Sequence, residues 1–280
     1  MIHAIKYQLP EELEGTPLEG IIHAKLHELT GAKERWPAAA IEAVLDRAPA
    51  IRSFKSALLR RAPAVIAEIK RASPSLGLLR QDFDPVAIAR EYRKSGAAAI
   101  SVVTEVQHFR GGLEHLARLR WACDLPLLRK DFIIDSYQIP ESRHAGADAV
   151  LLIAALLDDA TLKDLRLAIE NHGMDALVEV HSVEELERAL AAGATLIGVN
   201  ARDLRTFEVS PEVCVKLAAR LPKDVIAVAE SGIRTAKDLR RLADAGYRGF
   251  LVGEQLMRAP SPGAALAQLL GGAASARRAS

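Results

Sequence analysis

The sequence is poor in cysteine, and its beginning does not resemble a signal peptide. Cys123 and Cys214 are its only cysteines, and they lie far apart with no CxxC pair. This spacing argues against a disulfide framework or a zinc site and is typical of a reducing compartment. The first 15 residues contain no apolar segment of the kind that signal peptides carry. We therefore expect a cytoplasmic protein.

Neither a dominant charge nor a long apolar run is present. Lys and Arg total 37 against 36 Asp and Glu, so no global field favours nucleic acid or an anionic membrane. The longest strongly apolar run, 149–157, is nine residues, whereas a membrane-spanning helix needs about 20. GxGxxG and P-loop motifs are missing, which argues against a dinucleotide or nucleoside triphosphate site. We expect neither nucleic acid nor a membrane as a partner.

From residue 64 onward, short apolar runs alternate regularly with amphipathic stretches. The apolar runs predict strands, because parallel strands buried on both faces are continuously apolar. The predicted strands are 64–69, 98–103, 125–128, 147–152, 176–180, 196–199, 225–229 and 249–252. Several intervening helices end at a glycine suited to a C-cap: Gly96, Gly146, Gly193 and Gly246. Residues suited to N-caps are Asp84, Ser182, Ser210 and Thr235.

This rhythm predicts an α/β protein built as a (β/α)8 TIM barrel. Eight consecutive strand–helix units favour a closed barrel, since an open doubly wound sheet usually has about five or six strands. The barrel is expected over 64–271. Residues 1–63 form an N-terminal helical extension packed on it, with helices expected near 18–33, 38–47 and 53–61. The small, polar residues 272–280 are expected to form a disordered tail.

In such a barrel, functional residues lie at the C-terminal ends of the strands. The first predicted strand ends in Glu68 and Lys70, an acid and a base that share one face before a Ser-Pro-Ser loop. Lys130 follows the third strand directly after Leu127, Leu128 and Arg129. We expect desolvation to lower its pKa and make it a general acid, although pairing with Asp131 is the simpler alternative.

Glu179 lies near the end of the fifth strand with valines on both sides. Burial is expected to raise its pKa and let it exchange protons, and a structural ion pair with a barrel lysine is the alternative. Asn200 and Arg202 share one face after the sixth strand. Asn can orient a base or a hydroxyl, and Arg can bind a carboxylate, unless it pairs internally with Asp203 or Glu230.

The last two strands end in loops that suit a phosphate. One loop begins Glu230-Ser231-Gly232, and the other begins Gly253-Glu254. Glycines let backbone N–H groups approach an anion, and these loops commonly hold phosphate in such barrels. The alternative is that the glycines only make turns. Because the Glu254 carboxylate would repel a phosphate, we expect only its backbone to take part.

The histidines suggest no metal site. The eight histidines form no HxH or HxxxH pair, so surface or capping roles are favoured for each, His181 included. Asp82 and Asp84 form a carboxylate pair in the sequence, but Asp84 is better interpreted as a helix N-cap. We therefore expect no bound metal.

Eight stretches of the sequence, given below, together resemble the indole-3-glycerol phosphate synthase family of tryptophan biosynthesis. No single motif decides the resemblance, but LRKDF, EIKRASPS and VNxRDL together are highly specific. The matching stretches are AEIKRASPS (67–75), SVVTEVQHFRGG (101–112), LRKDFIID (128–135), GADAVLLIA (146–154), LVEVHS (177–182), IGVNARDL (197–204), AESGI (229–233) and LVGEQLMR (251–258).

The resemblance implies an enzyme that closes the ring of 1-(2-carboxyphenylamino)-1-deoxy-D-ribulose 5-phosphate with loss of CO2 and water, without a cofactor. It implies Lys130 as general acid and Glu179 as general base, with Lys70 near the substrate carboxylate and Glu68 and Asn200 orienting these groups. The remaining residues that it implies are substrate contacts Ser73, Phe109, Arg202, Glu230 and Ser231, and phosphate contacts Gly232, Gly253 and Glu254.

Two departures and two alternatives accompany the resemblance. Ala201 stands where relatives often have Asn or Ser, and Gly112 stands where Ser is common. Phosphoribosylanthranilate isomerase is one alternative, but it needs a Cys/Asp pair at strand ends, and Cys123 and Cys214 fall in predicted helices. A barrel that only binds a sugar phosphate is the other.

We expect a monomer, because the assigned helices leave no large apolar stripe, and transient contact with other tryptophan-pathway enzymes stays open.

Overall fold

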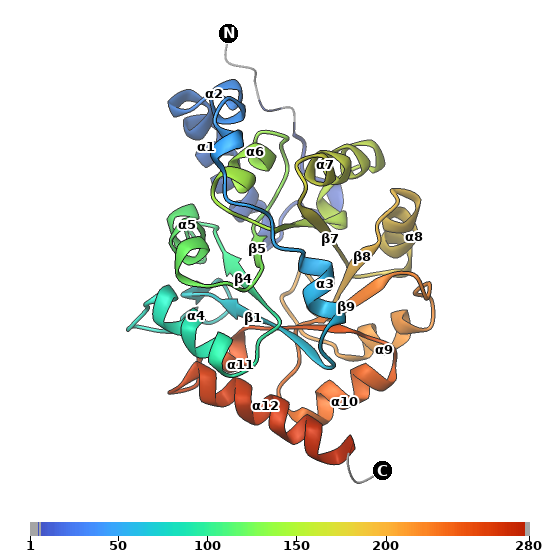
Figure 1. The fold of residues 1–280 in the computed structure, drawn as a ribbon. Coiled ribbons are helices and arrows are strands. Elements are labelled where there is room, and N and C mark those ends of the chain that lie inside the picture. Colours follow the sequence, from blue (N-terminus) through green and yellow to red (C-terminus); the bar gives the residue numbers. More distant parts are fainter. Residues whose placement is uncertain (1–4, 6, 278–280) are drawn as a thin grey trace.

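The barrel organises the whole chain. The computed structural model describes residue 5 and residues 7–277 (Figure 1). Within that part of the chain, eight parallel strands close into a barrel in the order β1-β10-β9-β8-β7-β6-β5-β4. The strands are β1 (Ala64–Ile69), β4 (Ala99–Val103), β5 (Leu127–Lys130), β6 (Ala149–Ile153), β7 (Asp175–Val180), β8 (Leu196–Asn200), β9 (Ile226–Glu230) and β10 (Gly249–Val252). The predicted TIM barrel is confirmed.

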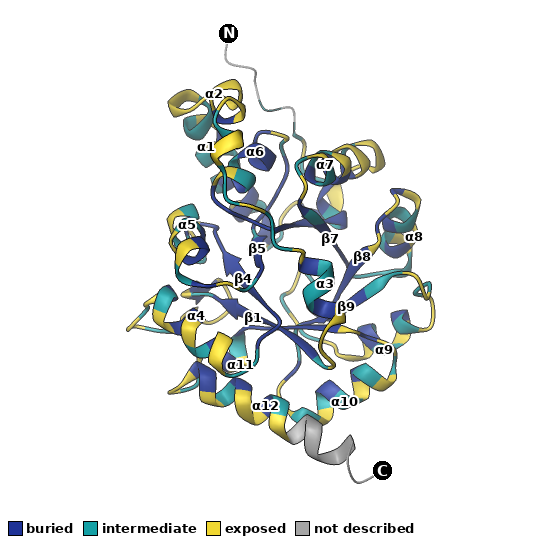
Figure 2. Cartoon of the chain, in the orientation of Figure 1, coloured by how far each residue is buried: buried dark blue, intermediate teal, exposed yellow. Residues whose placement is uncertain are grey.

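Helices follow the strands and surround the barrel (Figure 1). They are α4 (Pro85–Lys94), α5 (Leu113–Ala122), α6 (Gln138–His144), α7 (Asp159–Asn171), α8 (Val183–Ala191), α9 (Glu212–Ala218), α10 (Ala236–Asp244), α11 (Glu254–Met257) and α12 (Pro262–Arg277). Short additional elements are the hairpin β2 (Ala72–Ser73) and β3 (Gly77–Leu78), and the 3-10 turns η1 (Glu11–Leu13), η2 (Leu45–Arg47) and η3 (Ala154–Leu156). The strands are buried almost throughout, whereas the helices expose their outer faces (Figure 2).

The third barrel strand lies two residues later than the sequence predicts. Strand β5 covers Leu127–Lys130 and pairs with β4 from Ile100↔Leu127 to Val103↔Lys130, whereas the apolar run predicted 125–128. Arg129 can belong to a buried strand because its guanidinium pairs with Asp131 and Glu141 at 3.0 and 2.8 Å. The shift makes Lys130 the last residue of the strand, so its side chain starts from a fixed backbone.

Helix ends agree with the predicted caps with one exception. Side chains of Asp84, Ser182 and Thr235 cap α4, α8 and α10 by accepting backbone N–H groups. Ser210 does not cap α9, because Pro211 occupies the N-cap position and the helix begins at Glu212. The predicted C-cap glycines all have positive φ, the conformation in which glycine is favoured.

The N-terminal helices reach both ends of the barrel. They are α1 (Pro17–Arg35), α2 (Ala38–Glu42) and α3 (Phe54–Leu59). Helix α1 lies at the C-terminal ends of the strands, where the buried Lys25 ammonium is 2.8 Å from Asp131. Helix α3 lies in front of the barrel in Figure 1, over the opposite end, where Lys55 pairs with Asp175 at the start of β7.

The C-terminal helix is longer than the sequence indicated. Helix α12 extends to Arg277, past residue 271 where the sequence predicted a disordered tail. The residues after 271 include several alanines, which have the highest helix propensity and allow the helix to continue. Residues 278–280 of the expected tail lie outside the described residues.

Candidate active site

A cavity of about 170 Å³ opens at the C-terminal ends of the strands. All but one of the candidate residues named from the sequence line it. They come from strands around the barrel and from the loops that follow them: Glu68, Lys70, Phe109, Lys130, Glu179, Asn200, Arg202, Glu230, Ser231, Gly232, Gly253 and Glu254. Residues far apart in the sequence meet here because parallel barrel strands all end at the same rim.

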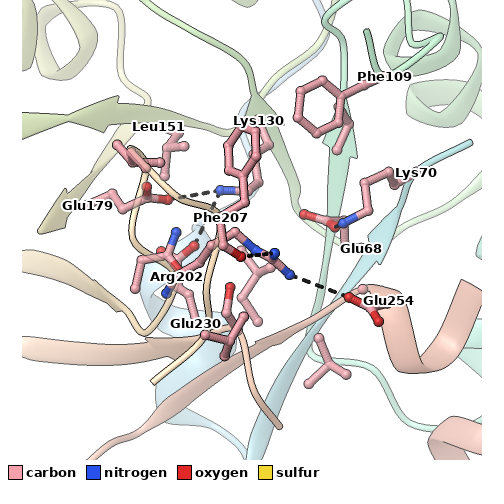
Figure 3. A pocket seen from close by; sticks show the side chains of 18 of the residues that line it. Glu68, Lys70, Phe109, Lys130, Leu151, Glu179, Arg202, Phe207, Glu230 and Glu254 are labelled. Atoms are coloured by element: carbon pink, nitrogen blue, oxygen red, sulfur yellow. Dashed lines mark hydrogen bonds and ion pairs between the residues drawn. The ribbon is translucent and has the colours of Figure 1, made fainter. Parts of the chain in front are cut away.

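The Lys130 ammonium lies at the centre of this cluster (Figure 3). It donates to Glu179 Oε2 at 2.9 Å and to Glu230 Oε2 at 3.4 Å. The side chains of Glu179 and Glu230 are each 1% exposed, and that of Lys130 is 21% exposed to the cavity. The Lys130 ammonium and the Glu179 carboxylate are therefore in hydrogen-bond contact, and the carboxylate is shielded from water.

The charges of this cluster reverse the pKa shifts expected from burial alone. Burial by itself lowers the pKa of Lys130, but the carboxylates of Glu179, Glu230 and Glu68 outweigh it and raise that pKa. Burial likewise raises the pKa of Glu179, but Lys130 and His181 outweigh it and lower that pKa. The sequence-based directions for both groups were therefore wrong, because a buried lysine next to buried carboxylates is stabilised as a cation.

Glu230 carries the opposite shift within the same cluster. Burial raises its pKa to about 8, and the negative charge of Glu179 adds to this, while Lys130 opposes it. Its Oε1 atom is buried and has no hydrogen-bond partner in the described part of the chain. Of the two carboxyl groups that contact Lys130, Glu230 therefore binds a proton more readily than Glu179 does.

Glu68 and Lys70 form a second acid–base pair on the other side of the cavity (Figure 3). Their charged groups are 2.7 Å apart. Burial raises the pKa of Glu68, but Lys70 and Lys130 outweigh this and lower it. Gly253 packs against this carboxylate so closely that a Cβ there would lie 2.1 Å from Glu68 Oε1. The glycine therefore leaves the space that the Glu68 carboxylate needs.

The loops after β9 and β10 lie beside one another at the rim. Ser231, Gly232 and Arg234 line the cavity from the first loop, and Gly253 and Gln255 line it from the second. Ser231 has a φ of 65°, which is uncommon for a residue with a side chain, and Gly232 follows with a φ of 73°. Strained backbone of this kind is often found at ligand sites.

Arg202 connects these loops to the one after β8. Its guanidinium donates to the Phe207 carbonyl at 2.8 Å and lies 3.4 Å from the Glu254 carboxylate (Figure 3). The expected internal partners, Asp203 and Glu230, are not the ones it contacts, since Asp203 pairs with Arg205. Arg202 thus offsets the Glu254 charge that would otherwise repel an anion.

Apolar side chains make the remaining wall of the cavity. Phe109 and Phe132 pack with ring centroids 6.2 Å apart. The buried Glu105 carboxylate fixes the loop before Phe109 by accepting the backbone N–H groups of residues 107, 108 and 109. Further apolar residues lining the cavity are Leu18, Leu151, Ile153, Leu204, Phe207, Val209 and Leu251. This wall suits a flat aromatic ring.

Ser73 is the candidate that the structure does not bring to the cavity wall. It lies on β2, where its side-chain hydroxyl is buried and without a hydrogen-bond partner among the described residues. The hairpin β2–β3 lies between the end of β1 and the start of helix α4, and the backbone N–H of Ala72 donates to the Phe109 carbonyl at 3.1 Å. The sequence did not predict this hairpin, because two-residue strands carry no periodic pattern.

Comparison with known proteins assigns the chain to a family. Residues 18–269 match the family model described as indole-3-glycerol phosphate synthase. The synthase of Albidiferax ferrireducens is 50% identical over 256 residues, which cover 90% of this chain and 97% of the relative. The synthase of Carboxydothermus hydrogenoformans is also 50% identical, over 263 residues that cover 90% of this chain and 99% of the relative. The chain belongs to the indole-3-glycerol phosphate synthase family.

More distant solved structures share the barrel. KGPDC from Streptococcus mutans has a TM-score of 0.58 and 16% identity, covering 76% of this chain and 98% of that one. Thiamine phosphate pyrophosphorylase from Pyrococcus furiosus has the same TM-score of 0.58 and 20% identity, covering 78% and 98%. These likenesses extend to the fold alone.

The structure adds functional candidates of this synthase that sequence analysis missed. His181 was expected at the surface or at a cap, but its ring lies 3.2 Å from the Glu179 carboxylate. Its position directly after the strand of Glu179 was the available signal, since a residue two along a strand shares the same face. Glu105 entered the sequence analysis only as part of the stretch SVVTEVQHFRGG (101–112). Phe132, Leu151 and Phe207 resemble core residues in the sequence, because apolar side chains in a cavity wall look like any others.

Metal-binding clusters and membrane-spanning helices are both missing from the described residues. These residues contain no group of three or more His, Cys, Asp or Glu side chains placed to hold a metal ion. Among those residues there is also no helix long and apolar enough to cross a membrane.

Proposed function

We propose that Lys130 and Glu179 are the general acid and general base of this synthase. The reaction converts 1-(2-carboxyphenylamino)-1-deoxy-D-ribulose 5-phosphate to indole-3-glycerol phosphate with loss of CO2 and water. The observation that carries the proposal is the 2.9 Å contact between the Lys130 ammonium and Glu179 Oε2 inside the cavity. A binding protein does not need a matched acid and base at hydrogen-bond distance.

The first chemical step is the attack of the aromatic ring on the ketone. The ring carbon bearing the carboxylate bonds to the ketone carbon while Lys130, which its neighbours keep protonated, gives a proton to the developing alkoxide. CO2 then leaves, and the electron pair of its bond restores the aromatic ring. Because rearomatisation drives the decarboxylation, we propose that no cofactor takes part.

The second phase removes water. The hydroxyl group leaves with a proton, and Glu179, ionised in this site, takes the proton from the adjacent carbon so that the double bond of the indole forms. The Lys70 ammonium, paired with Glu68 at 2.7 Å, is the group we assign to the substrate carboxylate and to assistance of dehydration. Asn200, whose side-chain oxygen accepts the backbone N–H of Arg202 at 3.0 Å, is assigned to orienting these groups.

The remaining contacts divide between the two ends of the substrate. We assign the ring to the apolar wall with Phe109, and the phosphate to the backbone of Gly232, Gly253 and Glu254. Further assigned substrate contacts are Ser73, Arg202, Glu230 and Ser231. Ser73 lacks a hydrogen-bond partner for its buried hydroxyl in the described structure, which supports a contact made when substrate is bound.

We propose that the enzyme works as a cytoplasmic monomer, with any contact to other tryptophan-pathway enzymes transient. Both cysteines are free thiols, which supports a reducing compartment. The isomerase alternative is not supported, because Cys123 and Cys214 are buried outside the residues that line the cavity.

The decisive experiment mixes the protein with the carboxyphenylamino-deoxyribulose phosphate in buffer containing EDTA and follows indole fluorescence. We expect a rising signal in the wild type, an unchanged signal in the control Lys163→Ala on the exposed face of α7, and a loss of about a thousandfold in Lys130→Ala. Tight substrate binding without product would instead favour the barrel that only binds a sugar phosphate. A requirement for added metal would contradict the proposed acid–base mechanism.

A further inference from the structure

His181 lies at the back of the proposed base, between two carboxylates. It follows β7 directly, and its side chain is 13% exposed. Its Nε2 lies 3.2 Å from Glu179 Oε1, and its Nδ1 lies 3.0 Å from Glu185 Oε2. Because each ring nitrogen faces a carboxylate oxygen, the ring suits the imidazolium form, in which both nitrogens carry protons.

The first turn of helix α8 fixes the ring in this orientation. Glu185 Oε2 also accepts the backbone N–H of His181 at 2.8 Å, so one carboxylate holds both the main chain and the ring. The N–H of Glu185 in turn donates to Ser182 Oγ, which caps the helix. This arrangement places Nε2 3.2 Å from Glu179 Oε1, where it is buried and meets no hydrogen-bond criterion in the described structure, and His181 is not among the residues that line the catalytic cavity.

Other charged groups near this pair come from several elements. Glu179 faces Lys130 on β5 and is also influenced by Glu68 on β1 and Glu230 on β9. A second cavity adjoins His181 on its outer side. The charged residues lining that cavity are Glu12, Glu184, Glu185, Arg188, Asp203, Arg205 and Glu208. Despite burial, which lowers it, the pKa of His181 is raised to about 10 by Glu179 and Glu185.

The two oxygens of Glu179 therefore have separate cationic partners. Oε2 receives the Lys130 ammonium and Oε1 faces the His181 ring. When Lys130 gives its proton to the alkoxide in the first step, the resulting amine is neutral and no longer balances the Glu179 charge. A buried carboxylate without a counter-ion binds a proton more readily, which would disable it as a base.

We infer that His181 is a positioning residue that keeps Glu179 ionised and oriented while Lys130 is neutral. The inference rests on the proposed roles of Lys130 and Glu179. The histidine keeps its own protons throughout: the proton on the alkoxide comes from Lys130, and the carbon proton goes to Glu179. After product release, Lys130 and the acid that protonated the leaving hydroxyl group regain their protons, and Glu179 loses the proton that it took. One net proton is thus taken from solvent per turnover, which balances the loss of CO2 from a carboxylate.

The test measures the pH dependence of kcat and KM for His181→Asn. Removal of the cation raises the Glu179 pKa, so we expect the acid limb of the kcat profile to move up by about one pH unit or more. The Glu179 carboxylate also loses the contact that orients it, so kcat at neutral pH is expected to fall about tenfold, with KM little changed. A purely structural role would lower the melting temperature and leave the acid limb in place.

Glu185→Gln provides a second, milder variant. The glutamine oxygen can still accept the His181 N–H, but the ring loses one negative neighbour, so its pKa falls and its charge is lost at lower pH. Because His181 is protonated at acidic pH in both proteins, we expect the acid limb to stay in place and kcat to fall at the alkaline end of the profile at a lower pH than in the wild type. Glu184→Gln, the exposed neighbour in the same turn of α8, is the matched control and should behave as the wild type.

The outcomes separate this inference from the proposed function. Absence of product from the wild type rejects the function itself. Product from the wild type, with an unmoved acid limb in His181→Asn and an unmoved alkaline limb in Glu185→Gln, rejects only the role of His181. If His181→Asn does not fold, the alkaline limb in Glu185→Gln decides, and a profile equal to that of Glu184→Gln rejects the inference.

Discussion

Single residues in the cavity owe their protonation states to their neighbours more than to burial. Lys130 stays a cation because Glu179 and Glu230 lie at 2.9 and 3.4 Å, even though burial alone would favour the neutral amine. Glu179 stays an anion for the reciprocal reason. In the proposed mechanism, Lys130 therefore enters the reaction charged and gives up its proton only as the alkoxide forms beside it.

This arrangement predicts that Glu179→Gln separates the release of CO2 from the formation of the indole. We expect turnover to fall by about 10²- to 10⁴-fold, because the later carbon proton has no acceptor. Ring closure and release of CO2 precede that step and should continue through one turnover. Single-turnover experiments with carboxyl-labelled substrate, comparing labelled CO2 with indole fluorescence, measure the two events separately.

The control for this experiment is again Glu184→Gln, in which CO2 and indole should appear together as in the wild type. If CO2 and indole were both suppressed equally in Glu179→Gln, then Glu179 would act before decarboxylation, and its assignment as the late base would be wrong.

At the scale of elements, a buried ion pair joins helix α1 to the residue that follows strand β5, which carries Lys130. Lys25 is fully buried and lies 2.8 Å from Asp131, which directly follows Lys130. Asp131 also accepts from Thr104 and Arg129. Burial raises the pKa of Asp131, but Lys25 and Arg129 outweigh it and lower the value to about 2. We propose that the N-terminal extension and the barrel unfold as one unit.

Lys25→Met tests this coupling. Removing Lys25 takes one of two cations from the buried Asp131 and leaves Glu28 without its cation, so we expect a loss of about 3 kcal/mol in the free energy of unfolding. The value of kcat should fall as well, since the end of β5 is no longer fixed. Urea unfolding followed by far-UV circular dichroism measures the loss, and a single transition is expected.

Lys33→Met is the matched control on the same helix. Lys33 pairs with Asp135 at 2.7 Å, but both side chains are partly exposed, so its loss should cost less than about 1 kcal/mol. Equal losses in the two variants, or a separate early transition for the extension, would contradict the proposed single unit.

At the scale of the whole molecule, the large apolar side chains at the surface are spread over several elements. Among the described residues they are Trp36, Leu59, Leu76, Leu78, Val106, Trp121 and Leu167. Trp36 and Trp121 line one surface groove, and Trp121 is 82% exposed. Isolated exposed apolar residues are normal on soluble monomers.

Sedimentation velocity tests the expected monomer. We expect a single species with the chain mass of 30.2 kDa at micromolar concentration, and tryptophan emission that does not change on dilution. A species of about twice that mass, lost in Trp121→Arg, would show instead that the groove is an interface between copies.

The sequence by itself determined the barrel, its strand ends and most of the candidate residues. Strand and helix periods are local properties of the chain, and the alternation of apolar runs with glycine-terminated helices leaves few other topologies. Polar residues such as Glu68 and Lys130 stand out at strand ends because a buried parallel strand is otherwise apolar. The family resemblance rested on the same stretches.

Only the tertiary structure decided how these residues act on one another. The pKa directions of Lys130 and Glu179 depend on distances between different strands, and burial alone predicted both incorrectly. The contact of His181 with Glu179, the buried pair of Lys25 with Asp131, and the partner of Arg202 also join separate elements. Coulomb energies change steeply over a few ångströms, and a linear sequence does not contain those distances.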